Sequence, residues 1–272
     1  MAYITFEIFA LVFGLCLGSF MNVCIARMPE DRSVVAPASA CPSCNTTIRP
    51  IDNIPVLSWL ILRGRCRNCS ISISPLYPTI ELIVGLMTLL LFRLIVPEIT
   101  LLTVQALGVW VFYSIFLSML VGLSYIDLKH YIIPDQFSIY AAPFGVAGCF
   151  LLPMLDGKIS SLPIPTWQDS AIGAVAGAGV LLAVIGVYWL IRREEGMGMG
   201  DVKLLGMIGA FLGWQAIAPV IFAASIIGSL VGIALMISAG RGFKSQVPFG
   251  PFLAIASVIY LFFGQPLVGL II

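Results

Sequence analysis

Long apolar runs, separated by short polar segments, dominate the chain from end to end. Eight of them predict membrane-spanning helices, because such a helix needs about 20 mainly apolar residues: residues 4–25, 80–96, 100–126, 136–154, 170–191, 202–213, 216–239 and 250–271. The sixth run is short and only Gly213 and Trp214 separate it from the seventh, so one bent helix, giving seven spans, is the alternative. The expected fold class is an all-α polytopic membrane protein with about eight transmembrane helices.

A polar stretch between the first two runs interrupts this pattern. Residues 27–79 are rich in arginine and proline and hold four of the seven cysteines. We therefore expect three parts: residues 1–26 as the first transmembrane helix, residues 27–79 as a small insertion domain, and residues 80–272 as a second transmembrane domain.

The composition supports a membrane protein and argues against other classes. Of the 272 residues, 60% are hydrophobic and only 10% are charged, and the mean hydropathy is +1.07. Soluble domains usually have about 25% charged residues, and disordered chains are far less apolar. The net charge of +1 gives no indication of nucleic-acid binding, so membrane lipid is the expected environment.

The 14 lysines and arginines predict the orientation, because cytosolic loops carry an excess of basic residues. With eight alternating spans, Arg93 and Lys158 fall on one face and the other 12 fall on the opposite face. This split places the insertion in the cytosol and both termini outside. The 12 residues of the cytosolic set are Arg27, Arg32, Arg49, Arg63, Arg65, Arg67, Lys129, Arg192, Arg193, Lys203, Arg241 and Lys244.

Two C-x-x-C pairs in the insertion predict a metal site. Cys41 and Cys44 form the first pair and Cys66 and Cys69 the second, with 21 residues between them. Two such turns can complete a tetrahedral zinc site, and a domain of this size folds poorly without such support. We interpret the four thiolates as a structural zinc site with no open catalytic position. A redox pair is the alternative, while cytosolic placement disfavours disulfides.

Two aspartates at the ends of predicted spans are candidates for catalysis. Asp127 ends the third span and Asp201 opens the sixth, so both lie at the cytosolic edge and could face each other. Asp127 paired with Lys129 or His130, and Asp201 as a helix N-cap, are the structural alternatives. Asp135 fits an N-cap of the fourth helix.

Glycines precede the second aspartate. Gly196, Gly198 and Gly200 form a G-x-G-x-G run, but an apolar span precedes it rather than the strand of a nucleotide-binding loop. We interpret Gly198 and Gly200 as flexible backbone that lets the chain approach a substrate closely.

These residues carry a resemblance to a known family. The Gly-Met-Gly-Asp sequence at 198–201 fits the G-x-G-D motif of intramembrane aspartyl peptidases, and the chain as a whole resembles the type IV prepilin peptidases, or prepilin leader peptidase/N-methyltransferases. Leu76 departs from the pattern, because arginine is expected before Tyr-Pro, and Met21 replaces a usual leucine. The matching segments are 18–23, 27–29, both C-x-x-C pairs, 52–55, 57–60, 63–66, 77–78, 81–82, Asp127, 133–135, 198–204 and 248–252.

The resemblance implies a bifunctional enzyme of the bacterial inner membrane. Such a protein removes the basic leader of prepilins and pseudopilins at the cytosolic membrane edge and methylates the new N-terminal residue with S-adenosylmethionine. The family's catalytic aspartates fall on Asp127 and Asp201, its cytosolic cysteine motif falls on the four cysteines, and residues 80–272 become the peptidase domain. We expect Lys129, Asp135 and Lys203 to support the aspartates.

Three other functions stay open on the sequence alone. Leu76 is compatible with a peptidase that has lost methyl transfer. A cation-coupled transporter using the two aspartates is a second alternative, although transporters usually place such acids near the bilayer midplane. A non-catalytic scaffold for pilus assembly, docking through the zinc domain, is the third.

Overall fold

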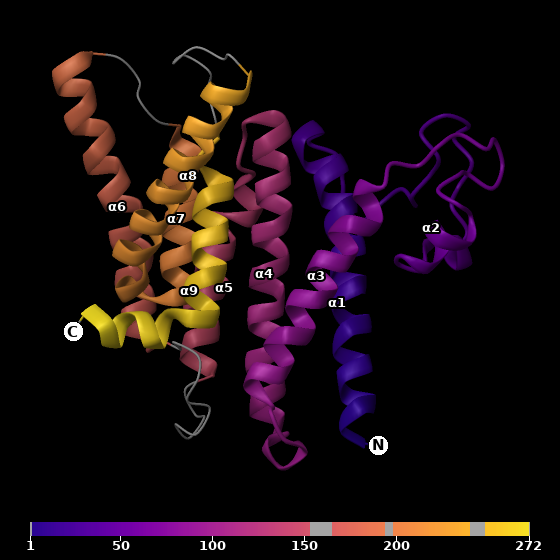
Figure 1. Cartoon of the computed structure of the whole chain (residues 1–272), viewed down its shortest axis with the longest axis horizontal. Coiled ribbons are helices and arrows are strands. Elements are labelled where there is room, and N and C mark those ends of the chain that lie inside the picture. The colour runs from indigo at the N-terminus through magenta and orange to yellow at the C-terminus, as the bar shows by residue number, and fades with distance from the viewer. Residues whose placement is uncertain (1, 153–164, 194–197, 240–247, 272) are drawn as a thin grey trace. The chain divides into compact units, whose positions relative to one another are not determined.

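The computed structural model describes residues 2–152, 165–193, 198–239 and 248–271, without the side chains of 265–271. Lys158, Gly196, Arg241 and Lys244 therefore lie outside the described residues. The chain divides into two compact units, residues 1–122 and 123–272, and the boundary falls within one long helix (Figure 1).

Each of the eight predicted apolar runs corresponds to a helix. These are α1 (Ala2–Arg27), α3 (Leu76–Ile95), α4 (Val104–His130), α5 (Ala141–Leu151), α6 (Trp167–Arg192), α7 (Met199–Leu212), α8 (Ile217–Ala239) and α9 (Gly250–Ile271). Within the described residues, five of them, α1, α3, α4, α6 and α8, are long and apolar enough to cross a membrane. The all-helical membrane class is confirmed, whereas eight complete spans remain a prediction, since α5 has 11 residues and α7 has 14.

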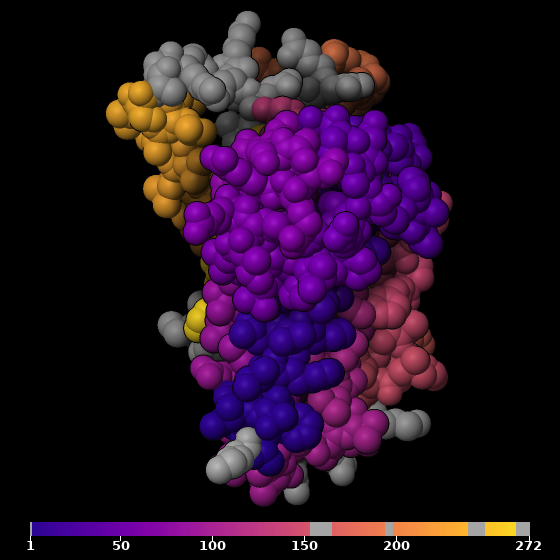
Figure 2. Space-filling model, turned by 90° about the vertical axis from the view of Figure 1, so that its right-hand side faces the viewer, coloured from indigo at the N-terminus to yellow at the C-terminus, as the bar shows by residue number. Residues whose placement is uncertain are grey.

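The first unit combines membrane helices with the polar insertion. α1 packs closely on α3: a Cβ atom added to Gly14 would lie 2.7 Å from Thr88 Cβ. On α4, the indole of Trp110 is buried and donates a hydrogen bond to the Thr88 carbonyl (3.0 Å). The insertion lies beside the C-terminal end of α1 and carries one short helix, α2 (Leu57–Ile61) (Figures 1 and 2).

The second unit is built around α7, whose residues Leu204–Leu212 are all buried. Gly173 and Gly177 of α6 make a close helix contact, because both face the α7 backbone and a Cβ on Gly177 would lie 2.5 Å from the Leu205 carbonyl oxygen. α7 and α8 are separate helices: Gly213 has a φ of +80°, which suits glycine, and a 3-10 turn (Trp214–Ala216) follows it. The single bent helix is therefore wrong.

Candidate active site

Asp127 is buried in the last turn of α4, where the start of α9 covers it. Asp127 is only 6% exposed, and its Oδ2 accepts a hydrogen bond from the Gly250 N–H (3.1 Å). Gly250 is the first residue of α9, and a Cβ at this position would lie 2.5 Å from Asp127 Oδ2. A glycine is therefore required for the backbone of α9 to approach the carboxylate this closely.

Asp201 lies in the first turn of α7 and is half-buried. It is close enough to Asp127 for the charges of the two carboxylates to interact. The structure thus brings together two acids that are 74 positions apart in the sequence, 201 minus 127. Two carboxylates whose charges interact can act as base and acid towards a water molecule.

Ile133 fills the space beside the pair. Its side chain is largely buried, and it lies 3.2 Å from where a Cβ of Gly200 would be and 3.4 Å from that of Gly250. This residue therefore contacts the backbone next to both acids and covers one side of the site. Ile133 and Gly250 lie in two segments of the family resemblance, 133–135 and 248–252, but no local pattern gives either residue a role, since only the fold brings them together.

Neither structural alternative for Asp127 and Asp201, an ion pair or a helix N-cap, is found among the residues that the structure describes. α7 has Gly198, not Asp201, at its N-cap, and Asp127 forms no ion pair within the described part of the chain. The prediction that Asp135 caps the fourth helix is wrong, because α5 begins only at Ala141, after a 3-10 turn that starts at Asp135.

Two of the three expected supporting residues form a pair. Lys203 Nζ lies 2.6 Å from Asp135 Oδ1, and this ion pair links α7 to the segment that carries Ile133. Lys129, in contrast, is exposed in the last turn of α4 and makes no ion pair among the described residues.

The four cysteines of the insertion converge in the first unit. Their Sγ atoms all lie within 4.8 Å of one another, and those of Cys41 and Cys69 are 3.7 Å apart. Four sulfurs at about 2.3 Å from a tetrahedral zinc ion are about 3.8 Å apart, so the cluster has the size that zinc requires. An antiparallel bridge flanks each C-x-x-C turn, Ala40 with Thr47 and Arg65 with Ser72.

The pKa values of the cysteine thiols also favour a bound cation in this cluster. The Thr46 side chain is the main cause that lowers the pKa of the Cys44 thiol to about 6. The Ile71 amide favours the Cys69 thiolate, but desolvation and the other three cysteines outweigh it and raise the pKa of Cys69 to about 11. Without a cation the four thiols cannot all ionise near neutral pH, whereas a divalent metal removes this conflict.

Comparisons with known proteins agree across both units. The family model for the bacterial peptidase A24 N-terminal domain matches residues 12–95, and that for the type IV leader peptidase family matches residues 114–233. No solved structure matches significantly.

Curated relatives carry one shared name over most of the chain. A prepilin leader peptidase/N-methyltransferase from Aeromonas hydrophila is 37% identical, over 93% of this chain and 89% of the relative. Proteins of the same name from Myxococcus xanthus and Pseudomonas aeruginosa are 39% and 31% identical, over 87% and 96% of this chain and 65% and 92% of the relatives. The chain therefore belongs to the prepilin leader peptidase/N-methyltransferase family.

Proposed function

We propose that this protein is an aspartyl endopeptidase of the bacterial inner membrane that removes the leader peptide of prepilins and pseudopilins and then methylates the new N-terminus. The observation that carries the proposal is that a buried Asp127 and a half-buried Asp201 lie close enough for their charges to interact, at the ends of two helices. The family membership supplies the substrate class, since the relatives are named prepilin leader peptidases.

In the proposed cleavage, the two carboxylates share one proton. The ionised aspartate takes a proton from water, which attacks the scissile carbonyl, while the protonated aspartate donates its proton to the carbonyl oxygen. The proton taken from water then passes to the leaving amine as the C–N bond breaks, and the other aspartate takes a proton back from the diol. We assign the base to Asp127, because its Oδ2 already accepts the Gly250 N–H, and the acid to Asp201. No covalent intermediate is required.

The proposed depth of the site suits the substrate. The excess of Lys and Arg on one face supports placing both aspartates and the insertion on the cytosolic side, with both termini outside. A prepilin has a basic leader in the cytosol and an apolar helix in the bilayer, and the bond to be cut lies between them. A dyad at the cytosolic membrane edge reaches that bond without extracting the helix.

The proposal divides the two activities between the units. Asp127 and Asp201 belong to the second unit, and the first unit carries the cysteine cluster. We infer that Cys41, Cys44, Cys66 and Cys69 hold one structural zinc ion and that the first unit serves methyl transfer. S-adenosylmethionine, when bound, supplies the methyl group in activated form.

The aspartates are tested by substitution with asparagine, which preserves size and removes the acid–base function. Purified Asp127→Asn and Asp201→Asn proteins should keep the helix content and melting temperature of the wild type. Each should cut a model prepilin at least about 100-fold more slowly, since acid–base groups contribute about 10²–10⁴-fold. Full cleavage by either variant would falsify the dyad.

A further inference from the structure

A buried acid in the first unit has no part in the aspartate site. Glu81, in the second turn of α3, is 8% exposed and forms no ion pair within the described residues. Its carboxylate accepts a short hydrogen bond from the Val56 N–H (2.7 Å), and the side chains of Ser19 and Asn22 also hydrogen-bond to it. One carboxylate thus contacts α1, α3 and the insertion, and burying such a group is costly unless these contacts are made.

The insertion is strained where it meets Glu81. Val56 has a φ of +61°, in the left-handed region that β-branched residues avoid. Such a conformation persists only where the surroundings hold it, and strained residues cluster at functional sites. The Glu81–Val56 hydrogen bond is one of the contacts that hold it in place.

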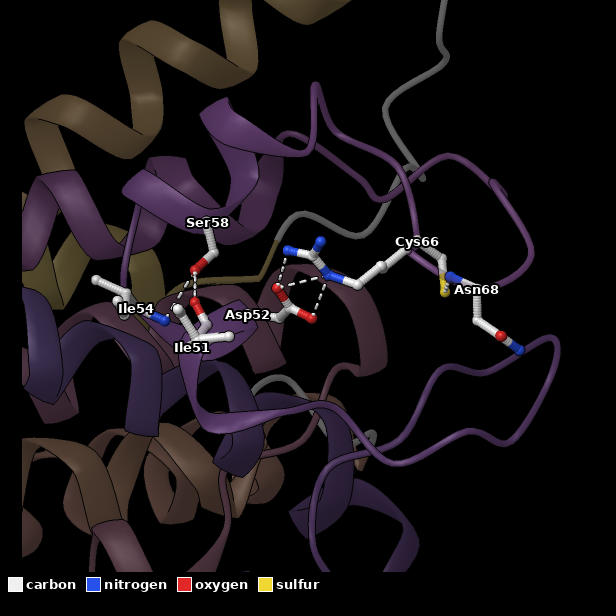
Figure 3. A network of polar contacts seen from close by, with 7 residues as sticks. Ile51, Asp52, Ile54, Ser58, Cys66 and Asn68 are labelled. Carbon is white, nitrogen blue, oxygen red and sulfur yellow. Dashed lines mark hydrogen bonds and ion pairs between the residues drawn. The ribbon is translucent and has the colours of Figure 1, made fainter.

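Polar contacts in the turn before α2 lead towards the cysteine cluster (Figure 3). Ser58 Oγ accepts the Ile54 N–H (3.0 Å) and donates to the Ile51 carbonyl (2.9 Å), which fixes the turn before α2. Asp52, in the same turn, pairs in bidentate fashion with Arg67, with contacts of 2.9 and 2.6 Å. Since Arg67 follows Cys66 directly, the turn is joined to the second C-x-x-C loop.

On the membrane side, α1 and α3 are held together at the same level. The Asn22 amide donates to the Tyr77 carbonyl (3.0 Å), and a Cβ on Gly18 would lie 2.6 Å from Glu81 Cα. The two helices are therefore in backbone contact at Glu81. The position of the insertion on these helices thus depends on this carboxylate.

We propose that Glu81 is a positioning residue for methyl transfer: its buried carboxylate holds the insertion at Val56 against α1 and α3. The inference rests on the proposed function, in which the first unit serves methyl transfer. Hydrolysis uses groups of the second unit and does not require this contact. Loss of Glu81 therefore separates the two activities.

The test uses the purified full-length protein and a model prepilin, with cleavage and methylation followed by mass spectrometry in one reaction. Glu81→Ala should lower the methylation rate at least about tenfold, as expected for losing hydrogen bonds to a charged group. Cleavage should stay within about twofold of the wild type, and the metal content should not change. Glu81→Gln keeps an acceptor oxygen for the Val56 N–H and should recover most of the methylation.

Two further variants keep the test decisive. Glu30→Ala, which removes an exposed acid paired with exposed Arg32, should change neither rate. Asn22→Ala leaves Glu81 in place but removes one of its hydrogen-bond partners, so it should also lower the methylation rate. This variant takes over the test if Glu81→Ala does not fold.

Three results would overturn the proposal: normal methylation by Glu81→Ala, parallel losses of cleavage and methylation, or Glu81→Gln being no better than Glu81→Ala. Failure of the wild-type protein to cleave and methylate in the same assay would instead overturn the proposed function.

Discussion

The cysteine cluster and the aspartate pair are built in opposite ways. The cluster uses residues 41–69, in two short loops that are each closed by an isolated bridge and lie in a polar insertion. The aspartate site uses residues 127, 201 and 250, from three apolar helices. The first is set by local sequence together with the metal that we propose, and the second by the packing of distant helices.

This difference predicts how each site fails. The cluster depends on its thiolates, so removing ligands or protonating them should release the metal. The aspartate pair depends on backbone contacts at glycines, so adding one methyl group should be enough to displace a carboxylate. Damage to one site should leave the chemistry of the other largely intact.

After substitution of the aspartates themselves, the largest effect is expected from Gly250→Ala. The added methyl would lie 2.5 Å from Asp127 Oδ2, so α9 or the carboxylate must move. Displacing a catalytic group by about 1 Å can cost about 100-fold in rate, and we expect a loss of that order in prepilin cleavage, measured by gel or mass spectrometry. Gly232→Ala is the matched control, because nothing lies within 4 Å of its Cβ position. Equal rates for the two variants would show that the Gly250 contact is unimportant.

At the cysteine cluster, a smaller loss of activity should follow from combining Cys41→Ser with Cys44→Ser. The metal content, measured by atomic absorption, should fall from about one zinc per chain to none, because only two of the four thiolates remain. Because the insertion should unfold without its metal, the methylation rate should fall about tenfold, and the cleavage rate should fall by a smaller factor. Cys16→Ser, on α1 and outside the cluster, is the control. A purified wild-type protein without metal would contradict the zinc site.

Lowering the pH should gradually weaken zinc binding at the cysteine cluster. Metal binding needs thiolates, and Cys44, whose pKa is about 6, gains a proton as the pH falls below that value. Affinity for zinc should therefore drop roughly tenfold or more per unit between pH 6 and pH 5, as competition with a coloured chelator can measure. Affinity that is independent of pH in this range would argue against thiolate ligands.

The smallest expected effect is a difference in cleavage rate between alanine variants of the two glycines of the G-x-G-D motif. A Cβ on Gly200 would lie 3.2 Å from Ile133, so a small shift of this side chain is needed, whereas the nearest described atom to a Cβ on Gly198 is the Gly200 nitrogen, at an ordinary contact distance of 3.9 Å. Gly200→Ala should lower the cleavage rate a few-fold and Gly198→Ala should not change it. The reverse order would mean that backbone flexibility at Gly198, and not packing at Gly200, is what the motif provides.

The sequence predicted those features that depend on local pattern. All eight apolar runs form helices, because run length and composition determine them, and the spacing of the cysteines predicted a cluster that the fold assembles. The ends of elements were less predictable. Asp135 was expected at a helix start because aspartate is a common N-cap, but its carboxylate pairs with Lys203 instead.

The contacts around both sites could not be predicted in this way. Gly250, Ile133 and Glu81 each lie in a segment of the family resemblance, yet their roles arise from partners 25 to 123 positions away in the sequence. Nothing in the local pattern shows that a glycine at a helix start will face a carboxylate. Such roles depend on tertiary packing, which single-sequence patterns do not encode.

The central claim is that cleavage and methylation use separate sites, and Asp201→Asn tests it most directly. The purified variant is given an intact prepilin in one reaction and an already cleaved pilin in another, and the products are weighed by mass spectrometry. We expect an unshortened prepilin in the first reaction and a normal rate of N-terminal methylation in the second. A shortened prepilin, or loss of methylation in step with cleavage, would show that the two activities share a site.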